Sequence, residues 1–192
     1  MIMGLIEERI KESIAVKEAI LCDGVLMGRI QDAADIIAES LGRGGKILFC
    51  GNGGSASDAL HLAAEFVGRF QKERVSLPAI ALNADVAAMT AIANDYGYDR
   101  IFARAVEGLM KPGDVLVGVS TSGNSENVYQ GILEARKAGG RTVALLGRDG
   151  GKIKGAADIP ITVPGRCTAR IQEAHIMIGH ILCEIAEGQM QA

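Results

Sequence analysis

The spacing of hydrophobic positions changes after the first forty residues of the chain. Up to Leu41, apolar residues recur every three or four positions, which predicts two amphipathic helices. The break between them falls at Cys22-Asp23-Gly24, where Asp23 is a suitable N-cap for the second helix. From residue 46 onward, short continuous apolar runs predict strands at Lys46–Cys50, Leu77–Leu82, Val115–Ser120, Thr142–Gly147 and Ile159–Val163.

Segments with helical spacing separate these strands. They lie at Ala56–Phe70, Asp85–Ala93, Asp99–Leu109 and Glu126–Lys137, and a last helix is expected from about Ala169 to Ala186. Strands without polar alternation, separated by helices, indicate a parallel sheet covered on both faces. We therefore expect an α/β fold: a three-layer αβα sandwich around a five-stranded parallel sheet, in a single domain over residues 1–192. Residues 43–192 would form the sandwich, and residues 1–42 would be an N-terminal helical extension available for oligomer contacts.

Charge and composition narrow the class of protein. Among 192 residues, 20 basic and 23 acidic side chains give a net charge of −3 without any Lys/Arg cluster, which disfavours non-specific binding to nucleic acid or membrane surfaces. The N-terminus carries acidic residues early, unlike a signal peptide, and no apolar stretch approaches the roughly 18 residues of a membrane span. We therefore expect a cytoplasmic protein. The four cysteines form no CxxC pair and are interpreted as reduced core thiols: Cys22, Cys50, Cys167 and Cys183.

A glycine-rich turn follows the first predicted strand. Gly51-Asn52-Gly53-Gly54-Ser55 leads directly into a helix, an arrangement that brings backbone N–H groups and the helix dipole to one point. Gly51, Gly53 and Ala56 fit a dinucleotide-binding fingerprint formally, but the acid expected at the end of the second strand is missing. The turn therefore indicates a site for an anion or polar ligand, and not for NAD.

A second informative loop follows the third predicted strand. Ser120-Thr121-Ser122-Gly123-Asn124-Ser125 precedes a helix and offers four hydroxyl groups beside its N-terminus. Hydroxyls and backbone N–H groups can together bind the oxygens of a phosphomonoester without a cation. No Gly-Lys-Ser/Thr sequence follows either loop, so hydrolysis of a nucleoside triphosphate is not indicated.

Three histidines occur in the chain, and two of them are candidates for chemistry. His61 and Glu65 are four residues apart and share one face of a predicted helix. Together with His180 and Gln172 of the last helix, they offer nitrogen and oxygen ligands suited to a divalent metal ion. His175 lies about 140° from His180 around the helix axis, so we interpret it as structural or interfacial.

Several motifs in a fixed order resemble the sugar isomerase (SIS) domain family over nearly the whole chain. They are FCGNGGSASDALHLAAEFVGRF, LPAIALN, TAIANDYGY, GDVLVGVSTSGNSENV, LLGRDGG and ARIQEAHIMIGHILCEI. Within the family, they resemble the branch that isomerises sedoheptulose 7-phosphate to D-glycero-D-manno-heptose 7-phosphate, the entry step to ADP-heptose for lipopolysaccharide and other surface glycans. The resemblance implies a flavodoxin-like SIS fold and a homotetramer with active sites between subunits.

The resemblance also implies roles for individual residues. The acid–base pair of the family falls on Glu65 and His180. Its metal ligands, zinc where a metal is seen, fall on His61, Glu65, Gln172 and His180. Its sugar- and phosphate-binding positions fall on Asn52, Gly53, Gly54, Ser55, Asn94, Asp95, Ser120, Thr121, Ser122 and Ser125, with the four metal-ligand positions also facing substrate.

Two questions stay open at the level of the sequence. Metal ligation would weaken Glu65 and His180 as free base and acid, so zinc either leaves room for ligand exchange or occupies the site in place of substrate. A related branch binds the bacterial replication initiator as a tetramer, and SLPAIALN and TAIANDYGY resemble that branch as well. The presence of Glu65 and His180, which that branch lacks, favours the enzyme, while a sugar-phosphate sensor without turnover is a third alternative.

Overall fold

The computed structural model describes residues 2–190. The ends of the predicted single domain, residues 1 and 191–192, therefore lie outside the described residues. Five parallel strands form one sheet: β1 (Ile47–Gly51), β2 (Ala79–Ala81), β3 (Val115–Ser120), β4 (Arg141–Gly147) and β5 (Ile159–Val163). Their order in the sheet is β2-β1-β3-β4-β5. The chain therefore reverses its direction of strand addition between β1 and β3, and in such sheets ligands bind beyond the carboxyl ends of the strands at this point.

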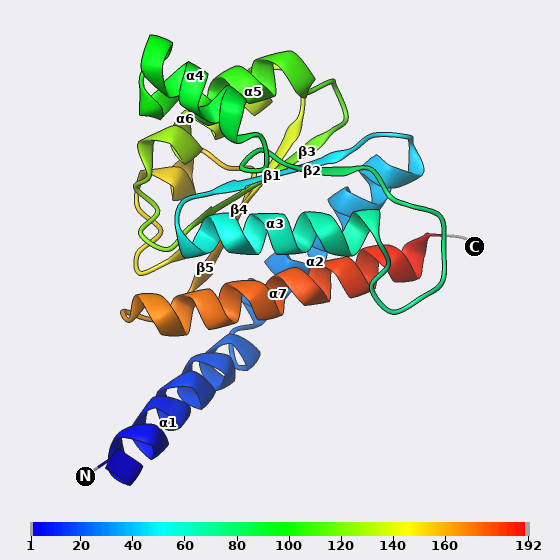
Figure 1. Cartoon of the computed structure of the whole chain (residues 1–192). Coiled ribbons are helices and arrows are strands. Elements are labelled where there is room, and N and C mark those ends of the chain that lie inside the picture. Colours follow the sequence, from blue (N-terminus) through cyan, green and yellow to red (C-terminus); the bar gives the residue numbers. More distant parts are fainter. Residues whose placement is uncertain (1, 191–192) are drawn as a thin grey trace.

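Helices cover both faces of the sheet, as Figure 1 shows. On one face lie α2 (Gly24–Gly42), α3 (Gly54–Val67) and α7 (Thr168–Gln189), whose apolar side chains share one buried cluster with the sheet. On the other lie α4 (Val86–Tyr96), α5 (Ile101–Leu109) and α6 (Glu126–Lys137), with the short 3-10 turns η1 (Tyr98–Arg100) and η2 (Lys152–Gly155). The predicted three-layer αβα sandwich is confirmed.

The two leading helices differ in their packing. Asp23 caps α2 as predicted, because its carboxylate accepts hydrogen bonds from the backbone N–H groups of Val25 and Leu26. α2 buries an apolar stripe that includes Ile30 and Ile37 against the sheet, so it belongs to the sandwich and not to an extension. Only α1 (Ile2–Leu21) projects from the body in Figure 1, and four of its apolar side chains are about half exposed: Leu5, Ile6, Ile10 and Ile14.

The cysteine prediction is confirmed for two residues and wrong for the other two. Cys50 in β1 and Cys183 in α7 are buried, and burial raises the pKa of each thiol to about 12. Cys22 and Cys167 are exposed, because neither lies on the apolar face of a helix. Cys22 directly follows α1, and Cys167 directly precedes α7. The core thiols are therefore unreactive at neutral pH.

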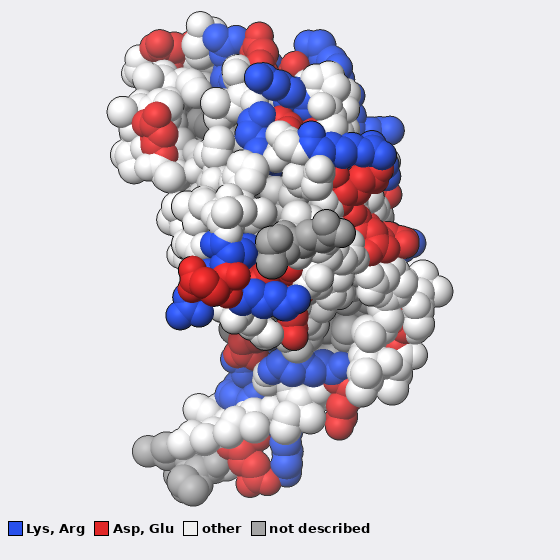
Figure 2. Space-filling view, turned by 90° about the vertical axis from the view of Figure 1, so that its right-hand side faces the viewer, with Lys and Arg blue, Asp and Glu red and all other residues white. Residues whose placement is uncertain are grey.

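The surface agrees with the modest net charge. Figure 2 shows acidic and basic side chains interspersed over the face that it presents, with many uncharged residues between them. Within residues 2–190, no helix is both long and apolar enough to cross a membrane.

Candidate functional site

The glycine loop (Gly51–Ser55) and the hydroxyl loop (Ser120–Ser125) lie side by side, because β1 is paired along its whole length with β3, from Ile47↔Val115 to Gly51↔Val119. Asn52 and Asn127 join them through two hydrogen bonds: each side-chain amide donates to the carbonyl oxygen of the other, at 2.8 and 2.9 Å. The hydroxyl group of Tyr98 also donates to the Asn52 Oδ1 atom at 2.9 Å. A cavity of about 260 Å³ opens beside the glycine loop.

Three hydroxyl groups of the hydroxyl loop converge. Ser120 is buried at the end of β3, and its Oγ atom lies 2.9 Å from Ser125 Oγ and 3.5 Å from Ser122 Oγ. Ser125 occupies the N-cap position of α6 without using its side chain for a capping hydrogen bond. The loop therefore presents hydroxyl donors at a helix N-terminus, which is the arrangement expected for a phosphate site.

The hydroxyl loop is held from behind by the turn that follows β4. Gly123 has φ +66°, and a Cβ atom there would overlap the backbone of Gly150 and Gly151. Ile153 donates its backbone N–H to the Gly123 carbonyl oxygen at 3.0 Å. Glycine at position 123 thus permits both the turn and its close contact with the neighbouring loop.

A second cluster lies where α3 and α7 run alongside each other. Gly179 of α7 packs directly on Leu62 of α3, where any larger residue would collide with the leucine side chain. This close approach brings His180 next to His61, with their Nε2 atoms 3.4 Å apart. Glu65, one turn after His61, places Oε1 at 3.0 Å from the same His61 nitrogen.

The geometry of this His61–Glu65–His180 cluster fits a metal ion. Its three ligand atoms all lie within 4.8 Å of one another. Ligands about 2.0–2.1 Å from a tetrahedral zinc ion are separated by about 3.3 Å, close to the 3.0 and 3.4 Å distances found here. Three protein ligands with a free fourth position are typical of catalytic zinc sites. The His61 side chain is 48% exposed and that of Glu65 24%, so the cluster is accessible from the outer surface of α3 and α7.

Three other predicted site residues lie outside this histidine cluster. The Gln172 amide lies against Gly54 of the glycine loop. Gln172 is eight residues before His180, a rise of about 12 Å along α7. Asn94 and Asp95 are exposed near the end of α4, where the Asn94 amide donates to Asp95 at 2.8 Å. In the described part of the chain, neither makes a hydrogen bond to the glycine loop or the hydroxyl loop.

His175 is structural, as predicted. It is fully buried, and its Nε2 atom lies 2.9 Å from the backbone carbonyl oxygen of Leu146 in β4. Burial lowers the pKa of the imidazole to about 4, against a partial opposing effect of that hydrogen bond. His175 is therefore neutral at physiological pH and ties α7 to the sheet.

The sequence interpretation missed Tyr98, Asn127 and Phe70. Asn127 stands in the first turn of the helix after the hydroxyl loop, a position from which a side chain can reach a neighbouring loop. The ring of Phe70 stacks on His180, with centroids 5.5 Å apart and an interplanar angle of 25°. No local pattern signals this contact, since Phe70 lies in an irregular segment far from His180 in the sequence.

Comparisons with known proteins agree with this architecture. A family model for the SIS domain matches residues 15–147. The chain belongs to the SIS domain family. Among its SIS relatives, a phosphoheptose isomerase from Clostridium acetobutylicum is 50% identical over 187 residues, covering 97% of this chain and 95% of the relative. One from Nitratiruptor is 60% identical over 158 residues, covering 82% and 84%.

A solved SIS structure shows the same fold. The phosphoheptose isomerase of Neisseria gonorrhoeae superimposes with a TM-score of 0.91 at 42% identity, covering 98% of this chain and 100% of that one. The resemblance indicated by the sequence motifs is therefore confirmed, both for the SIS family and for its phosphoheptose isomerase branch.

Proposed function

We propose that this chain is an aldose–ketose isomerase that converts D-sedoheptulose 7-phosphate to D-glycero-D-manno-heptose 7-phosphate, the first step of ADP-heptose biosynthesis. The observation that carries the proposal is the convergence of Glu65, His180 and His61 on adjacent helices. Relatives named phosphoheptose isomerase, at 50–60% identity over most of both chains, support the choice of substrate. A cytoplasmic location agrees with a phosphorylated sugar as substrate.

The reaction moves one proton between two carbon atoms. A base removes a proton from C1 of the ketose, which leaves a cis-enediolate, and return of the proton to C2 gives the aldose. Glu65 serves as the carbon base, since its carboxylate is held by His61 yet remains partly exposed to a ligand. His180 moves the proton between the oxygens on C1 and C2. Each such acid–base role contributes roughly 10²- to 10⁴-fold in rate.

The substrate is held by the two loops at the strand ends. Hydroxyl groups and backbone N–H groups of the hydroxyl loop bind the phosphate: Ser120, Thr121, Ser122 and Ser125. The glycine loop binds the sugar hydroxyls, with Asn52 oriented by its amide pair to Asn127. Further substrate contacts are assigned to Gly53, Gly54, Ser55, Asn94 and Asp95.

We also propose one zinc ion per subunit, held by the clustered donors His61, Glu65 and His180. The family resemblance adds Gln172 as a further ligand, although its amide lies against Gly54 in the single chain. Zinc supplies Lewis-acid stabilisation of oxygen anions when bound. The three clustered donors fit it in type and spacing. A zinc ion bound there would compete with the carbon-base role of Glu65, so the response of activity to a chelator decides whether zinc assists or occupies the site in place of substrate.

The same cluster supports assembly into a homotetramer with active sites between subunits. About half of the His61 side chain and a quarter of the Glu65 side chain are exposed on the outer surface of α3 and α7, so a second copy packed there would close the site. The exposed apolar residues of α1 offer a contact surface for a second copy. Water exclusion from the enediolate would then come from the neighbouring subunit.

The test is an NMR time course of the purified protein with sedoheptulose 7-phosphate in D2O, with added zinc and with chelator. Glu65→Gln should abolish deuterium incorporation and aldose formation while the fold is retained. Glu107→Gln, an exposed carboxylate on α5, is the matched control and should be as active as the natural protein. A Glu65→Gln variant with full turnover would remove Glu65 from the mechanism. No conversion under either condition would favour a non-catalytic SIS tetramer that binds the replication initiator, or a sugar-phosphate sensor.

A further inference from the structure

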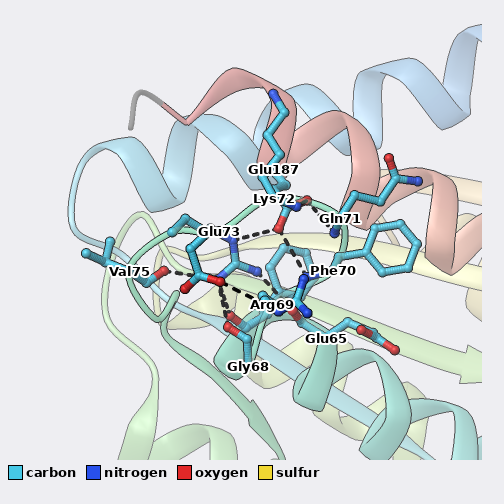
Figure 3. A network of polar contacts seen from close by, with 11 residues as sticks. Glu65, Gly68, Arg69, Phe70, Gln71, Lys72, Glu73, Val75 and Glu187 are labelled. Carbon is cyan, nitrogen blue, oxygen red and sulfur yellow. Dashed lines mark hydrogen bonds and ion pairs between the residues drawn. The ribbon is translucent and has the colours of Figure 1, made fainter.

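The segment between α3 and β2 contains no helix or strand, yet a buried ion pair holds it in place. Glu187, near the end of α7, accepts hydrogen bonds from the backbone N–H groups of Phe70, Gln71 and Lys72 at 3.1, 2.8 and 2.9 Å. Its fourth partner is Arg74, whose Nε donates at 2.9 Å. The two charged side chains are only 2% and 6% exposed. Figure 3 shows this segment wrapped around the Glu187 carboxylate.

Arg74 uses its other N–H groups on the C-terminal end of α3. Its Nη2 donates to the Glu65 carbonyl oxygen at 2.9 Å, and its Nη1 donates to those of Phe66 and Gly68 at 2.9 and 3.2 Å. The last carbonyls of a helix have no partner within the helix and favour a nearby cation. The guanidinium therefore fixes the backbone of Glu65 itself.

Phe70 connects this network to the second helix of the site. Its backbone N–H is held by Glu187, and its ring stacks on the imidazole of His180 at 5.5 Å. His61 meets the same imidazole edge-on, with ring centroids 5.0 Å apart and an interplanar angle of 68°. The His180 ring is thus held between an aromatic ring and its neighbour in the cluster.

We propose that Phe70 is a positioning residue that sets the orientation of the His180 ring, and that the Arg74–Glu187 pair holds Phe70 while fixing Glu65. This inference rests on the proposed function, because it assigns these residues a purpose in the same reaction. A buried ion pair contributes little net stability compared with apolar side chains of the same volume. Its four hydrogen bonds to one short segment instead give that segment a single conformation.

The experiment compares Phe70→Leu and Phe70→Tyr in the full-length protein. Leucine keeps the apolar volume but loses the flat ring, whereas tyrosine keeps the ring. Phe102→Leu, a fully buried phenylalanine on the opposite face of the sheet, controls for loss of stability alone. We expect Phe70→Leu to lower kcat about tenfold, a fraction of the roughly 10²- to 10⁴-fold contribution of one acid–base group. KM should change less than twofold because the hydroxyl loop is untouched, and Phe70→Tyr should restore kcat.

A second measurement does not depend on turnover. With three histidines in the chain, the ring signals of His180 can be assigned in carbon-edited NMR spectra, and His175 is an internal reference. In Phe70→Leu, the chemical shifts of the His180 ring should change because the ring current of the stacked phenyl group is lost. The His180 ring should also sample more than one orientation. The chemical shifts of the His175 ring should stay unchanged.

The outcomes separate this inference from the proposed function. If the natural protein isomerises the substrate but Phe70→Leu matches Phe102→Leu in kcat, the positioning role of Phe70 is wrong. Unchanged His180 signals in Phe70→Leu would overturn it as well. If the natural protein is inactive but the His180 ring loses its orientation in Phe70→Leu, the positioning stands and the proposed reaction fails.

Discussion

Acidification should destabilise this protein through His175, and the size of the effect follows from its surroundings. The Nε2 atom lies beside a backbone carbonyl oxygen, which can only accept, so the neutral ring carries its proton there. The Nδ1 atom is buried and has no hydrogen-bond partner in the part of the chain that the structure describes. A second proton would therefore place an unpaired N–H and a charge in the core.

The pKa difference sets the magnitude. Burial lowers the pKa of His175 from 6.5 to about 4 in the folded state. Between about pH 6.5 and pH 4, His175 therefore binds a proton in the unfolded chain but not in the folded chain. The free energy of unfolding falls as the pH decreases through this range. At about 1.36 kcal/mol per pH unit, the loss is about 2 kcal/mol by pH 5 and about 3 kcal/mol by pH 4.

Urea unfolding at fixed protein concentration, with chelator present, measures this loss. His175→Gln cannot titrate but keeps an N–H donor for Leu146. The free energy of unfolding of the natural protein, minus that of the variant, should fall by about 2 kcal/mol between pH 7.5 and pH 5. Other titrating groups cancel in this difference. A difference that stays constant over that range would refute the reasoning.

Three further predictions concern the site and the core. Replacing Ser120, Ser122 and Ser125 together by Ala should raise KM by about 1,000-fold or more, since three hydrogen bonds to a charged group, at about 1.5–3 kcal/mol each, together contribute at least about 4.5 kcal/mol; an unchanged KM would remove the hydroxyl loop from the site. Cys50→Ala should lower the unfolding free energy by about 1 kcal/mol without altering kcat of the folded enzyme, and a selective loss of kcat would contradict its role as a core residue. For Glu187, burial raises the pKa of the carboxyl, but the backbone N–H groups it accepts from and the Arg74 charge together lower it by more, so the net pKa lies below its ordinary value. The stabilisation by Glu187 is therefore fully present above the unfolded pKa of about 4.3. Glu187→Gln should therefore cost stability at pH 7 and progressively less as the pH falls below about 4.3, which acid titration of the unfolding free energy would check.

The sheet and most helices were predictable from local patterns. Val115–Ser120 and Ile159–Val163 match the observed strands, because a buried parallel strand leaves an uninterrupted apolar run in the sequence. The end of α3 was not predictable: the expected helix continued to Phe70, whereas it ends at Val67. Its last carbonyls are bonded to Arg74, which is held in turn by Glu187 from 113 positions away, and no local pattern encodes that contact.

The candidate site likewise combines contacts that the local sequence predicts with contacts that only the tertiary fold creates. The spacing of His61 and Glu65 predicts their contact, because residues four apart share one helix face. His180 joins them only through the packing of α3 on α7 at Gly179, which depends on the tertiary fold. Gln172 was added to the predicted ligand set from its residue type in the last helix and from the family resemblance, whereas in a single chain its amide lies against Gly54.

The parallel pairing of β1 with β3 also has a consequence for how the protein is made. Gly51 and Val119 are partners in the sheet although they are 68 positions apart, and the contacts to His180 come from the last helix of the chain. During synthesis from the N-terminus, the two loops meet only after the middle of the chain has emerged, and the histidine cluster closes only after α7 is complete. Nascent or truncated chains that end before α7 therefore contain the glycine loop and the hydroxyl loop but lack His180 and the apolar side chains, such as Ile178, with which α7 covers the sheet. Such chains cannot form the histidine cluster, so conversion of the sugar phosphate requires α7 to be synthesised and packed against α3.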